Sequence, residues 1–375
     1  MIILSLLLLP FTVGYFLFLH RIRRGIKSLV PAGDPSAPLP FVSILVAARN
    51  EEGTIQRCLH ALLAQEYPPD FWEVIIVDDG STDRTGERVR AIAKENPPVS
   101  LISLPNDDVG RIGRKPTALD QGIRKARGEV ILTTDADCSM GRQWVRTMVS
   151  MVTGQSVFVA GPVLEKGGRS LFARLQQLEF LGLVTTTAGL IGSGRPIICN
   201  GANLAFKKSV YFAAGGFGEG NHSCDDEVMM QRILHRNLGK VDFAALPEAI
   251  VTTRPSERFS DFWRQRTRWA SKHNHYENPS VLVRVISIYI FFVLLLLGII
   301  LAPFSPFMGT VALIVLSGKM LFEYITLRAG SQRFRVPLSI PEFFLAQIFH
   351  IPYIVLAGAA GQFRSVEWKG RAIRP

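Results

Sequence analysis

Hydrophobic positions divide the chain of 375 residues into three parts. Residues 1–19 are almost wholly apolar, long charge-free apolar runs return after residue 278, and the middle alternates short β-branched runs with helical periods. A helix that spans a bilayer needs about 20 apolar residues, so the ends predict membrane helices and the middle predicts a globular domain. Charged residues make up 19% of the chain, against roughly 25% in soluble domains. This composition excludes a wholly soluble enzyme, and the apolar content excludes intrinsic disorder.

The first apolar run predicts an N-terminal transmembrane anchor over residues 1–20. A cleaved signal peptide fits less well, because no basic residue precedes the run, no small-residue cleavage site follows it, and a basic cluster comes at once. Basic residues collect on the cytoplasmic side of membrane helices, so we expect the N-terminus outside and the following residues in the cytoplasm. Residues 21–40 read as a basic, proline-rich linker without regular structure.

Residues 279–375 predict a second membrane region that ends in a basic tail. Two apolar runs joined by a proline-containing turn indicate a transmembrane hairpin over 281–327. Lys319 and Glu323 lie four residues apart on its return helix and therefore share a face. They either pair inside the protein or extend toward the membrane surface.

The last apolar segment, 340–361, has a less regular pattern. It contains polar residues and two prolines, and basic residues flank it on both sides. A full crossing would place one basic flank outside, against the usual charge distribution. The segment therefore predicts a broken, re-entrant or interfacial helix pair, with a fourth span as the alternative.

The central part, residues 41–278, predicts an α/β domain. Continuous apolar runs that read as strands buried on both faces occur at 41–48, 73–79, 99–104, 129–137 and 156–164. Helical periods between them occur at 53–64, 84–94 and 117–127. Strands that alternate with helices imply right-handed crossovers and a Rossmann-like, mixed but mostly parallel sheet. Ligands of such sheets bind at the carboxyl ends of the strands, so polar residues there are the candidates for chemistry.

The charge distribution narrows the choice of partners. The net charge of +11 comes from 42 Lys and Arg residues against 31 Asp and Glu residues, and much of the excess lies beside the apolar ends. That placement favours contact with a membrane surface and with phosphate-bearing substrates. The chain has no zinc-finger spacing or other nucleic-acid module, so we expect no nucleic-acid partner.

The cysteines indicate a reduced environment. They are widely spaced and form no CxxC pair, which is typical of a cytosol-facing domain in which each cysteine is a small core residue. The four are Cys58, Cys138, Cys199 and Cys224.

Acidic residues follow the first two predicted strands. Glu51 lies just beyond Ala47 in the turn after the first strand, and Asp79 ends the second strand beside a glycine. Carboxylates at such strand ends can accept hydrogen bonds from a base N–H or a ribose hydroxyl. The sequence Asp-Gly-Ser-Thr-Asp at 79–83 is equally compatible with a plain turn that caps the next helix.

Two further carboxylates, Asp135 and Asp137, end the fourth predicted strand. They offer hard oxygen ligands for Mg²⁺ or Mn²⁺ shared with the phosphates of a substrate, although an isolated Asp-x-Asp is also frequent by chance. Lys115 opens the preceding helix and can reach a phosphate as a point charge. The spacing GxxxxGK[ST] is absent, which excludes a P-loop NTPase.

Two later segments carry the remaining candidates. Asp225 and Asp226 open a helix after a glycine-rich stretch, where they are either caps or, for one of them, a general base aimed at an acceptor hydroxyl. Gln265, Arg268 and Trp269 lie on one face of a basic, aromatic helix. That helix is either an interfacial anchor or a clamp in which guanidinium and indole close over a diphosphate and an acceptor ring.

Taken in order, these motifs resemble those of the family 2 glycosyltransferases, inverting enzymes with a GT-A fold. The resemblance covers about residues 42–269 and rests on five motifs: Asn50-Glu51-Glu52, Val77-Asp78-Asp79-Gly80-Ser81-Thr82-Asp83, Asp135-Ala136-Asp137, Asp225-Asp226 and Gln265-Arg266-Thr267-Arg268-Trp269. Two motifs depart from the family pattern. Residues 47–50 read Ala-Ala-Arg-Asn where Pro-x-Tyr-Asn is common, and Asp225-Asp226 stands where Glu-Asp is common. Neither departure removes a chemical group that the mechanism needs.

The resemblance implies a donor site at the strand ends. The backbone near Ala47, together with Glu51 and Asp79, would hold the nucleobase. Lys115 and Asp135 would hold the rest of the nucleotide. Asp137, with Asp135 beside it, would bind Mg²⁺ or Mn²⁺.

The resemblance also implies an acceptor site. Asp226 would be the catalytic base, with Asp225 as the alternative. Asn203 lies in a segment similar to the one that precedes the base in this family, on the acceptor side. The acceptor and diphosphate motif, QxxRW, would consist of Gln265, Arg268 and Trp269.

The expected activity is that of a metal-dependent, hexosyltransferase-type enzyme. It would move a sugar from a nucleotide-diphospho-sugar, with a UDP-sugar preferred, to a membrane-embedded lipid, carotenoid, polyprenyl or glycan acceptor. We expect a multi-pass protein of the cell (plasma) membrane whose catalytic domain faces the cytoplasm. A processive polysaccharide synthase is the alternative, although three or four spans are few for a polymer channel. An inactive nucleotide-sugar-binding scaffold fits less well, because every charged role is filled.

Overall fold

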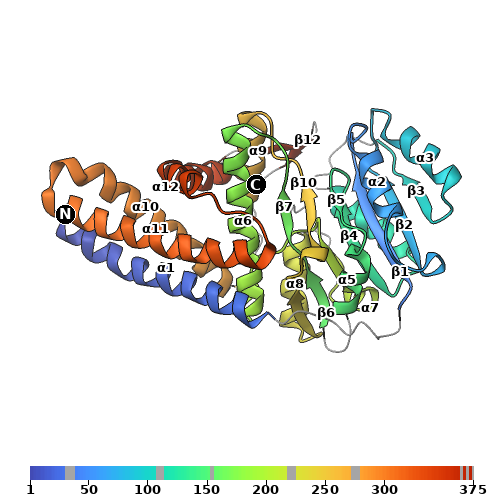
Figure 1. Ribbon diagram of the computed structural model, residues 1–375, viewed down its shortest axis with the longest axis horizontal. Coiled ribbons are helices and arrows are strands. Elements are labelled where there is room, and N and C mark those ends of the chain that lie inside the picture. The colour runs from blue at the N-terminus through green and yellow to red at the C-terminus, as the bar shows by residue number, and fades with distance from the viewer. Residues whose placement is uncertain are drawn as a thin grey trace.

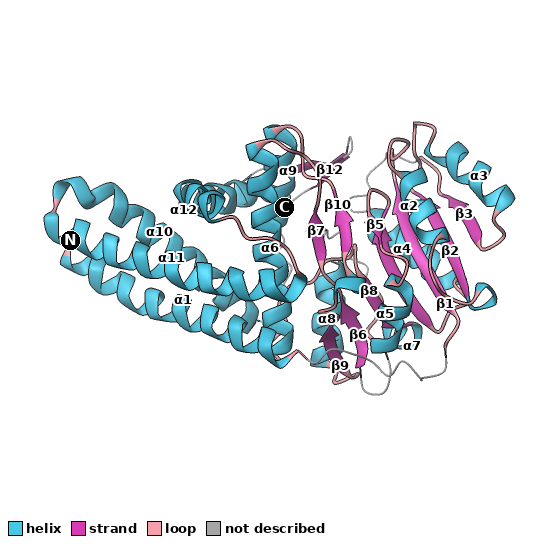
Figure 2. Cartoon of the chain, in the orientation of Figure 1, coloured by secondary structure: helices cyan, strands magenta, loops and turns pink. Residues whose placement is uncertain are grey.

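The computed structural model describes residues 1–29, 39–106, 114–152, 156–217, 225–271, 279–363, 366–368 and 371–373. An α/β domain forms one end of the molecule, and long apolar helices extend away from it at the other end (Figure 1). The strands lie together at the first end, whereas the other end is entirely helical (Figure 2).

The central sheet has seven strands in the order β3-β2-β1-β4-β8-β6-β9. Strands β3, β2, β1 and β4 run parallel, β8 is antiparallel to both of its neighbours, and β9 is parallel to β6. The expected mixed, mostly parallel sheet is therefore confirmed. The strands are β1 (Val42–Ala48), β2 (Trp72–Asp78), β3 (Val99–Ser103), β4 (Val130–Asp135), β6 (Ser156–Ala160), β8 (Leu204–Lys207) and β9 (Lys240–Phe243).

Helices cover both faces of this sheet. Strand β1 is buried on both faces: Val46 packs in the cluster that contains α2, α3 and α5, and Leu45 packs in the cluster that contains α4, α7 and α8. The helices expected at 53–64, 84–94 and 117–127 are confirmed, the last beginning three residues earlier. The helices are α2 (Ile55–Leu63), α3 (Thr85–Glu95), α4 (Arg114–Lys125), α5 (Trp144–Met151), α7 (Lys208–Ala213) and α8 (Asp225–His235).

The cysteines behave as small core residues, as expected. Cys58, Cys138 and Cys199 are free and buried, and Cys224 lies outside the described residues. Burial raises the pKa of the Cys58 and Cys138 thiols well above the usual value, and the nearby carboxylates of Asp137 and Asp135 raise it further. Neither thiol is therefore available as a thiolate nucleophile.

The single strand expected at 156–164 is wrong, because the chain divides there into β6 and β7 (Val163–Glu165). Pro162 has no N–H to donate to a ladder, and a Cβ on Gly161 would collide with the side chain of Asn203. Strand β7 joins a second, three-stranded sheet in the order β5-β10-β7, with β5 at Ser139–Met140 and β10 at Val251–Thr253. This small sheet lies next to the carboxyl end of β4.

Among the described residues, four helices are long and apolar enough to cross a membrane, and they include the apolar segments expected from the sequence. The first of them continues to Ser28, so the expectation of a linker without regular structure over 21–40 is wrong for residues 21–28. The two apolar runs expected at 281–327 form two helices, α10 and α11, joined by a short 3-10 turn. The broken helix pair expected at 340–361 is wrong, because this segment is one continuous helix with Pro352 inside it; neighbouring helices can supply the contacts that a proline removes. The four are α1 (Ile2–Ser28), α10 (Pro279–Leu301), α11 (Pro306–Phe334) and α12 (Ile340–Phe363).

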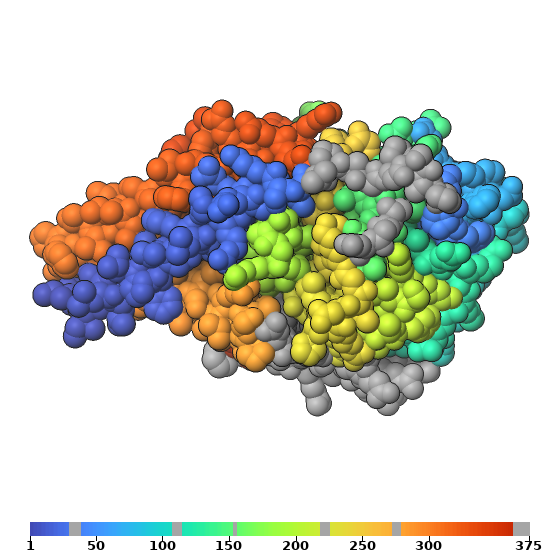
Figure 3. All heavy atoms as spheres, turned by 90° about the horizontal axis from the view of Figure 1, so that it is seen from below, coloured from blue at the N-terminus to red at the C-terminus, as the bar shows by residue number. Residues whose placement is uncertain are grey.

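The long helix α6 (Leu171–Gly192) connects the two ends of the molecule, and the sequence pattern did not predict it. Its buried residues occur on several sides, so it lacks the single apolar stripe that reveals an amphipathic helix. It contacts β7 and β9 on one side and α1, α11 and α12 on the other. Figure 3 shows α1, in blue, lying against the lime-green surface of α6.

The remaining elements are short, apart from the helix α9 next to α12. They are η1 (Pro69–Phe71), η2 (Pro247–Ala249), α9 (Phe259–Ala270), η4 (Ala302–Phe304), β11 (Val366–Trp368) and β12 (Arg371–Ile373).

Candidate active site

The carboxyl ends of β1, β2 and β4 meet at one edge of the sheet. The register pairs Ala47 with Asp135 and Ala48 with Asp78, so residues far apart in the sequence become neighbours. The sequence could predict this meeting because parallel strands all end at the same edge.

The loops after β1 and β2 are locked together. The guanidinium of Arg49 is buried and donates hydrogen bonds to the carbonyls of Asp79 at 2.7 Å and Gly80 at 3.0 Å. Gly80 has a φ of +64°, a conformation that favours glycine. The backbone N–H of Glu51 donates to the hydroxyl of Thr85 at 2.8 Å. The candidate nucleobase residues Ala47, Glu51 and Asp79 therefore lie on one rigid edge.

Two other carboxylates of this region have local structural partners. Asp78 accepts a hydrogen bond from the backbone N–H of Ser81 at 3.0 Å, and Asp83 accepts one from that of Thr85 at 2.9 Å at the start of α3. The turn-and-cap interpretation of 79–83 thus applies to Asp83, while Asp79 stands at the end of β2.

A cleft opens beside this edge and collects most of the predicted site residues. Elements far apart in the sequence line it: α4, the end of β4, the loop before β8, the start of α8, β10, α6 and α9. The predicted residues among its walls are Lys115, Asp135, Asp137, Asp226, Gln265, Arg268 and Trp269.

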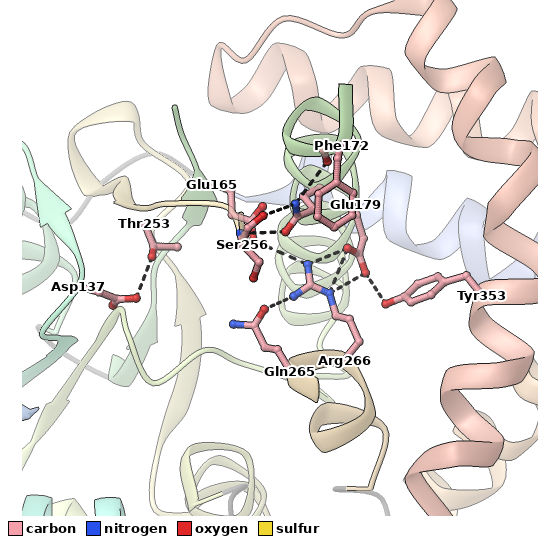
Figure 4. Close-up of polar contacts among 10 residues, drawn as sticks. Asp137, Glu165, Phe172, Glu179, Thr253, Ser256, Gln265, Arg266 and Tyr353 are labelled. Atoms are coloured by element: carbon pink, nitrogen blue, oxygen red, sulfur yellow. Dashed lines mark hydrogen bonds and ion pairs between the residues drawn. The ribbon is translucent and has the colours of Figure 1, made fainter. Parts of the chain in front are cut away.

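Asp135 ends β4 and Asp137 lies two residues beyond it, and their side chains have different hydrogen-bond partners. Lys115 on α4 donates a hydrogen bond to Asp135 and forms an ion pair with it. Asp137 accepts a hydrogen bond from the hydroxyl of Thr253 at 3.1 Å (Figure 4), and its backbone carbonyl accepts one from Arg57 at 2.7 Å. Asp137 therefore projects into the cleft with a neutral neighbour at one carboxylate oxygen.

These oxygens suit a divalent cation that also binds a substrate. Among the described residues, no group of three or more His, Cys, Asp or Glu side chains is arranged to hold a metal. Mg²⁺ typically binds through one or two carboxylates and completes its shell with phosphate oxygens and water. Asp137 and Asp135 both line the cleft and offer such oxygens, and Asp135 also pairs with Lys115.

Asp226 lies at the beginning of α8, in the wall of the same cleft. One of its carboxylate oxygens accepts a hydrogen bond from the backbone N–H of Gly201 at 2.7 Å, and the other accepts one from that of Glu227 at 3.0 Å. Two backbone donors fix the carboxylate, and the helix N-terminus favours its negative charge. The side chain of Asp225, the alternative base, lies outside the described residues.

Helix α9 supplies the opposite wall. Gln265, Arg268 and Trp269 all line the cleft, as their spacing on one helical face predicts. The indole of Trp269 packs edge-on against the ring of Phe180 on α6, with 5.8 Å between centroids. The face of α9 that carries the motif is thus held against α6.

Asn203 requires a correction. Its side chain is wholly buried, accepts a hydrogen bond from the indole of Trp144 at 2.9 Å, and donates to the carbonyls of Pro162 at 2.9 Å and Ala249 at 2.8 Å. Asn203 lies behind the cleft wall, where its amide joins η2 and Pro162, just before β7, to the sheet. Its neighbours Asn200, Gly201 and Ala202 line the cleft instead.

Other wall residues were not among the predicted ones. Thr253 belongs to the three-residue strand β10 and Phe180 to the unpredicted helix α6, and neither belongs to a motif. The remaining unpredicted residues of the wall are Leu119, Thr133, Cys138, Val163, Leu204 and Phe217.

Comparison with known sequences identifies the class. The family model described as "Glycosyl transferase family 2" matches residues 43–212, and the one described as "Glycosyl transferase family group 2" matches residues 130–340, which is more than half of the chain. The fold is thus that of a GT-A-type glycosyltransferase domain joined to apolar helices. The chain belongs to the family 2 glycosyltransferases.

Several curated proteins share part of this sequence. A probable glycosyltransferase, YdaM, of Bacillus subtilis is 29% identical over 62% of this chain and 55% of its own length. A β-monoglucosyldiacylglycerol synthase of Nostoc is 28% identical over 62% of this chain and 48% of its own length. A poly-β-1,6-N-acetyl-D-glucosamine synthase of Staphylococcus epidermidis is 27% identical over 61% and 53%. The chain spans about half the length of these relatives.

A solved structure shares the fold over nearly the whole chain. The mannosyltransferase PcManGT of Pyrobaculum calidifontis, in complex with GDP-Man and Mn²⁺, aligns with a TM-score of 0.61 over 96% of both chains at 20% identity. This likeness extends through the apolar helices as well as the sheet.

Proposed function

We propose that this protein is an inverting glycosyltransferase that moves a sugar from a nucleotide-diphospho-sugar to the hydroxyl of an acceptor dissolved in the membrane. The observation that carries the proposal is the cleft itself. It brings Asp137, Asp226 and the 265–269 segment together where α9 and α6 contact the apolar helix α12.

In the proposed reaction, Asp226 accepts the proton of the acceptor hydroxyl. The acceptor oxygen forms a bond to the anomeric carbon while the bond from that carbon to the diphosphate breaks, which inverts the configuration. Arg268 and Lys115 line the cleft and are placed to attract the negative charge that develops on the leaving nucleoside diphosphate. A divalent cation held by Asp137 would neutralise part of that charge.

A divalent cation and a nucleotide sugar are both compatible with the related fold. PcManGT was solved with GDP-Man and Mn²⁺. We propose the same classes of ligand here, with Ala47, Glu51 and Asp79 at the nucleobase and Lys115 and Asp135 beside the phosphates.

The choice of acceptor follows from the apolar helices and from the relatives. Four of the described helices could cross a membrane, and one of them, α12, packs directly against α9. We propose a multi-pass arrangement in which residues 41–278 form a cytoplasmic catalytic domain and 279–375 form the C-terminal membrane region. The likeness to β-monoglucosyldiacylglycerol synthases favours a lipid hydroxyl as acceptor.

A processive polysaccharide synthase is the second candidate. The similarity to poly-β-1,6-N-acetyl-D-glucosamine synthases over 61% of this chain favours it. The two candidates differ in product size, because single transfer yields one glycolipid whereas a synthase yields a polymer.

The proposal is tested by a donor screen with the protein in nanodiscs. Radiolabelled UDP-glucose, UDP-N-acetylglucosamine and GDP-mannose are supplied in turn with membrane lipid and Mn²⁺, and parallel samples contain a chelator. We expect label from one donor to enter the organic phase as a discrete species, and the chelator to prevent this. High-molecular-weight aqueous label would favour the synthase, and no transfer from any donor would reject the proposal.

A further inference from the structure

An arginine of α9 faces away from the cleft and is almost fully buried. Arg266 lies between Gln265 and Arg268, is 3% exposed, and does not line the cleft. Its guanidinium forms a two-pronged ion pair with Glu179 on α6: Nε lies 3.0 Å from Oε1 and Nη2 lies 2.7 Å from Oε2 (Figure 4). This fork-to-fork geometry fixes orientation as well as distance.

The same guanidinium is enclosed by aromatic rings. It lies 4.4 Å from the ring centroid of Trp269, 4.6 Å from that of Phe262 and 5.3 Å from that of Phe180. Its third nitrogen donates to the side-chain oxygen of Gln265. Arg266 therefore contacts three side chains of the cleft wall, Gln265, Trp269 and Phe180, from behind.

Helix α12 reaches this cluster through one hydroxyl. Tyr353 donates a hydrogen bond to Oε1 of Glu179 at 2.7 Å (Figure 4), and its ring packs on Phe262 with 5.6 Å between centroids. Glu179 thus accepts hydrogen bonds from α9 and from α12 at once. Through this carboxylate, an apolar helix and the helix that lines the cleft are held to the same point on α6.

Helix α12 is fixed again one and two turns earlier. Gln347 and His350 contact the ammonium of Lys319 on α11 at 2.7 and 3.1 Å, and the amide of Gln347 donates to Glu323 at 2.9 Å. Two polar contacts on successive turns therefore tie α12 to α11 on one side and to α6 and α9 on the other.

We propose that Arg266, Glu179 and Tyr353 are positioning residues that hold the acceptor side of the cleft in place. Through them, the geometry of the cleft depends on the position of α12 among the apolar helices. This inference rests on the proposed sugar transfer. The three residues touch neither donor nor acceptor; they act through Gln265 and Trp269.

Tyr353→Phe tests this proposal most specifically, because it removes one hydroxyl and keeps the ring packed on Phe262. The matched control is Tyr289→Phe, since Tyr289 also donates to α12, through the carbonyl of Val355 at 3.0 Å, but outside the cluster. A displacement of about 1 Å at a reacting group can lower a rate about a hundredfold. We expect kcat to fall about ten- to a hundredfold in Tyr353→Phe, the KM for the nucleotide sugar to stay within about twofold, and Tyr289→Phe to match the wild type.

Arg266→Lys separates positioning from simple charge. An ammonium keeps the charge but lacks the planar fork. We expect Arg266→Lys to lose transfer to the same extent as Tyr353→Phe while it binds the nucleotide sugar normally. Full activity of Arg266→Lys and of Tyr353→Phe would overturn the proposal.

Amide hydrogen exchange of α9 tests the same inference without any sugar transfer. Loss of a hydrogen bond to a charged acceptor shifts a local opening equilibrium by about tenfold. Residues 259–270 should exchange about tenfold faster in Tyr353→Phe than in Tyr289→Phe. Equal exchange in the two variants contradicts the positioning role even if the wild type transfers no sugar, whereas faster exchange in a protein without transferase activity would reject only the proposed reaction.

Discussion

Asp226 and Asp137, the candidate base and the candidate metal ligand, have different hydrogen-bond partners. Asp226 receives two backbone N–H donors at a helix start, which orient a negatively charged oxygen toward the cleft. Asp137 has the hydroxyl of Thr253 at one oxygen. A carboxylate that backbone donors hold at the cleft wall suits proton acceptance, and a carboxylate that lines the cleft beside a hydroxyl suits a cation shared with phosphates.

Candidate site residues could be predicted where a short motif stands at the end of a strand or at the start of a helix. Asp135, Asp137 and Asp226 are of this kind, because the local chain already determines where each one emerges. Asn203 was expected on the acceptor side of the site. Nothing in the sequence indicates that the indole of Trp144 donates a hydrogen bond to its side chain instead. Partners such as Thr253 depend on a small sheet whose strands are only two or three residues long.

Glu165 provides a prediction on pH. It ends β7 and is 7% exposed, and burial raises its pKa to about 7 although Arg266 of α9 acts in the opposite direction. The charged groups that face it are Arg266, at 3.7 Å, and Glu179 on α6. The folded protein therefore holds a proton that an unfolded chain releases near pH 4.5. The stability due to this proton is fully present below about pH 4.5 and is lost as the pH rises through 7.

Glu165→Gln removes this dependence. Relative to wild type, the variant should gain stability as the pH rises from 5 to 8, by up to about 3 kcal/mol in the free energy of unfolding, at about 1.4 kcal/mol for each unit of pKa shift. Thermal unfolding of both proteins in nanodiscs at pH 5, 6, 7 and 8 measures the difference. The exposed Glu248→Gln serves as control. Parallel curves for wild type and Glu165→Gln would show that Glu165 does not bind the proton.

At the scale of elements, the packing of α1 on α6 depends on glycines. A Cβ on Gly25 would collide with the carbonyl oxygen of Gly189, and a Cβ on Gly192 would collide with that of Gly25. The hydroxyl of Ser28 donates to the carbonyl of Gly192 at 2.6 Å beside this crossing. The two backbones therefore approach so closely that only glycine fits, as in tightly packed membrane helices.

Gly25→Ala tests this crossing, with Gly14→Ala on the same helix as control. Nothing described lies within 4 Å of a Cβ at Gly14. We expect Gly25→Ala to reduce the free energy of unfolding by about 1–3 kcal/mol through overpacking, and Gly14→Ala to change it by no more than about 0.5 kcal/mol. Thermal unfolding in one nanodisc preparation measures both. Equal melting temperatures would show that α1 does not pack on α6 through Gly25.

Whole elements were predicted well where one period dominates the pattern. The buried strands β1, β2 and β4 and the helices between them follow from continuous apolar runs and helical periods. Helix α6 was missed because its partners lie on several sides, so that no single period remains. The continuity of α12 was missed because its prolines and polar residues suggested a break, whereas in the fold the polar residues Gln347 and His350 contact another helix.

At the scale of the whole molecule, a buried polar cluster holds the apolar helices together. Lys319 is fully buried and lies 2.9 Å from Glu323, and the hydroxyl of Tyr15 on α1 donates to Glu323 at 2.6 Å. The cluster thus joins α1, α11 and α12. Of the two sequence alternatives for Lys319 and Glu323, pairing inside the protein is the one the structure contains.

Lys319→Met should be strongly destabilising, because it leaves the carboxylate of Glu323 buried without its cation. Breaking a buried pair in this way costs about 3–5 kcal/mol. The double variant Lys319→Met with Glu323→Gln removes the uncompensated charge and should recover most of the loss. Lys27→Met, on the exposed side of α1, serves as control and should change the free energy of unfolding by no more than about 0.5 kcal/mol. Thermal unfolding of wild type and the three variants measures these effects. If Lys319→Met were as stable as wild type, the role of the cluster would be contradicted.

The central claim, transfer of a sugar to a membrane-dissolved acceptor by the cleft around Asp226, is tested most directly by one comparison. Wild type and Asp226→Asn, in the same nanodiscs, are given the labelled donor that the screen selects, and both donor binding and label in the organic phase are measured. We predict equal donor binding and at least about a hundredfold less labelled lipid from Asp226→Asn, since the amide has the size of the carboxylate but cannot accept the proton of the acceptor hydroxyl. Transfer by Asp226→Asn at the wild-type rate would contradict the account.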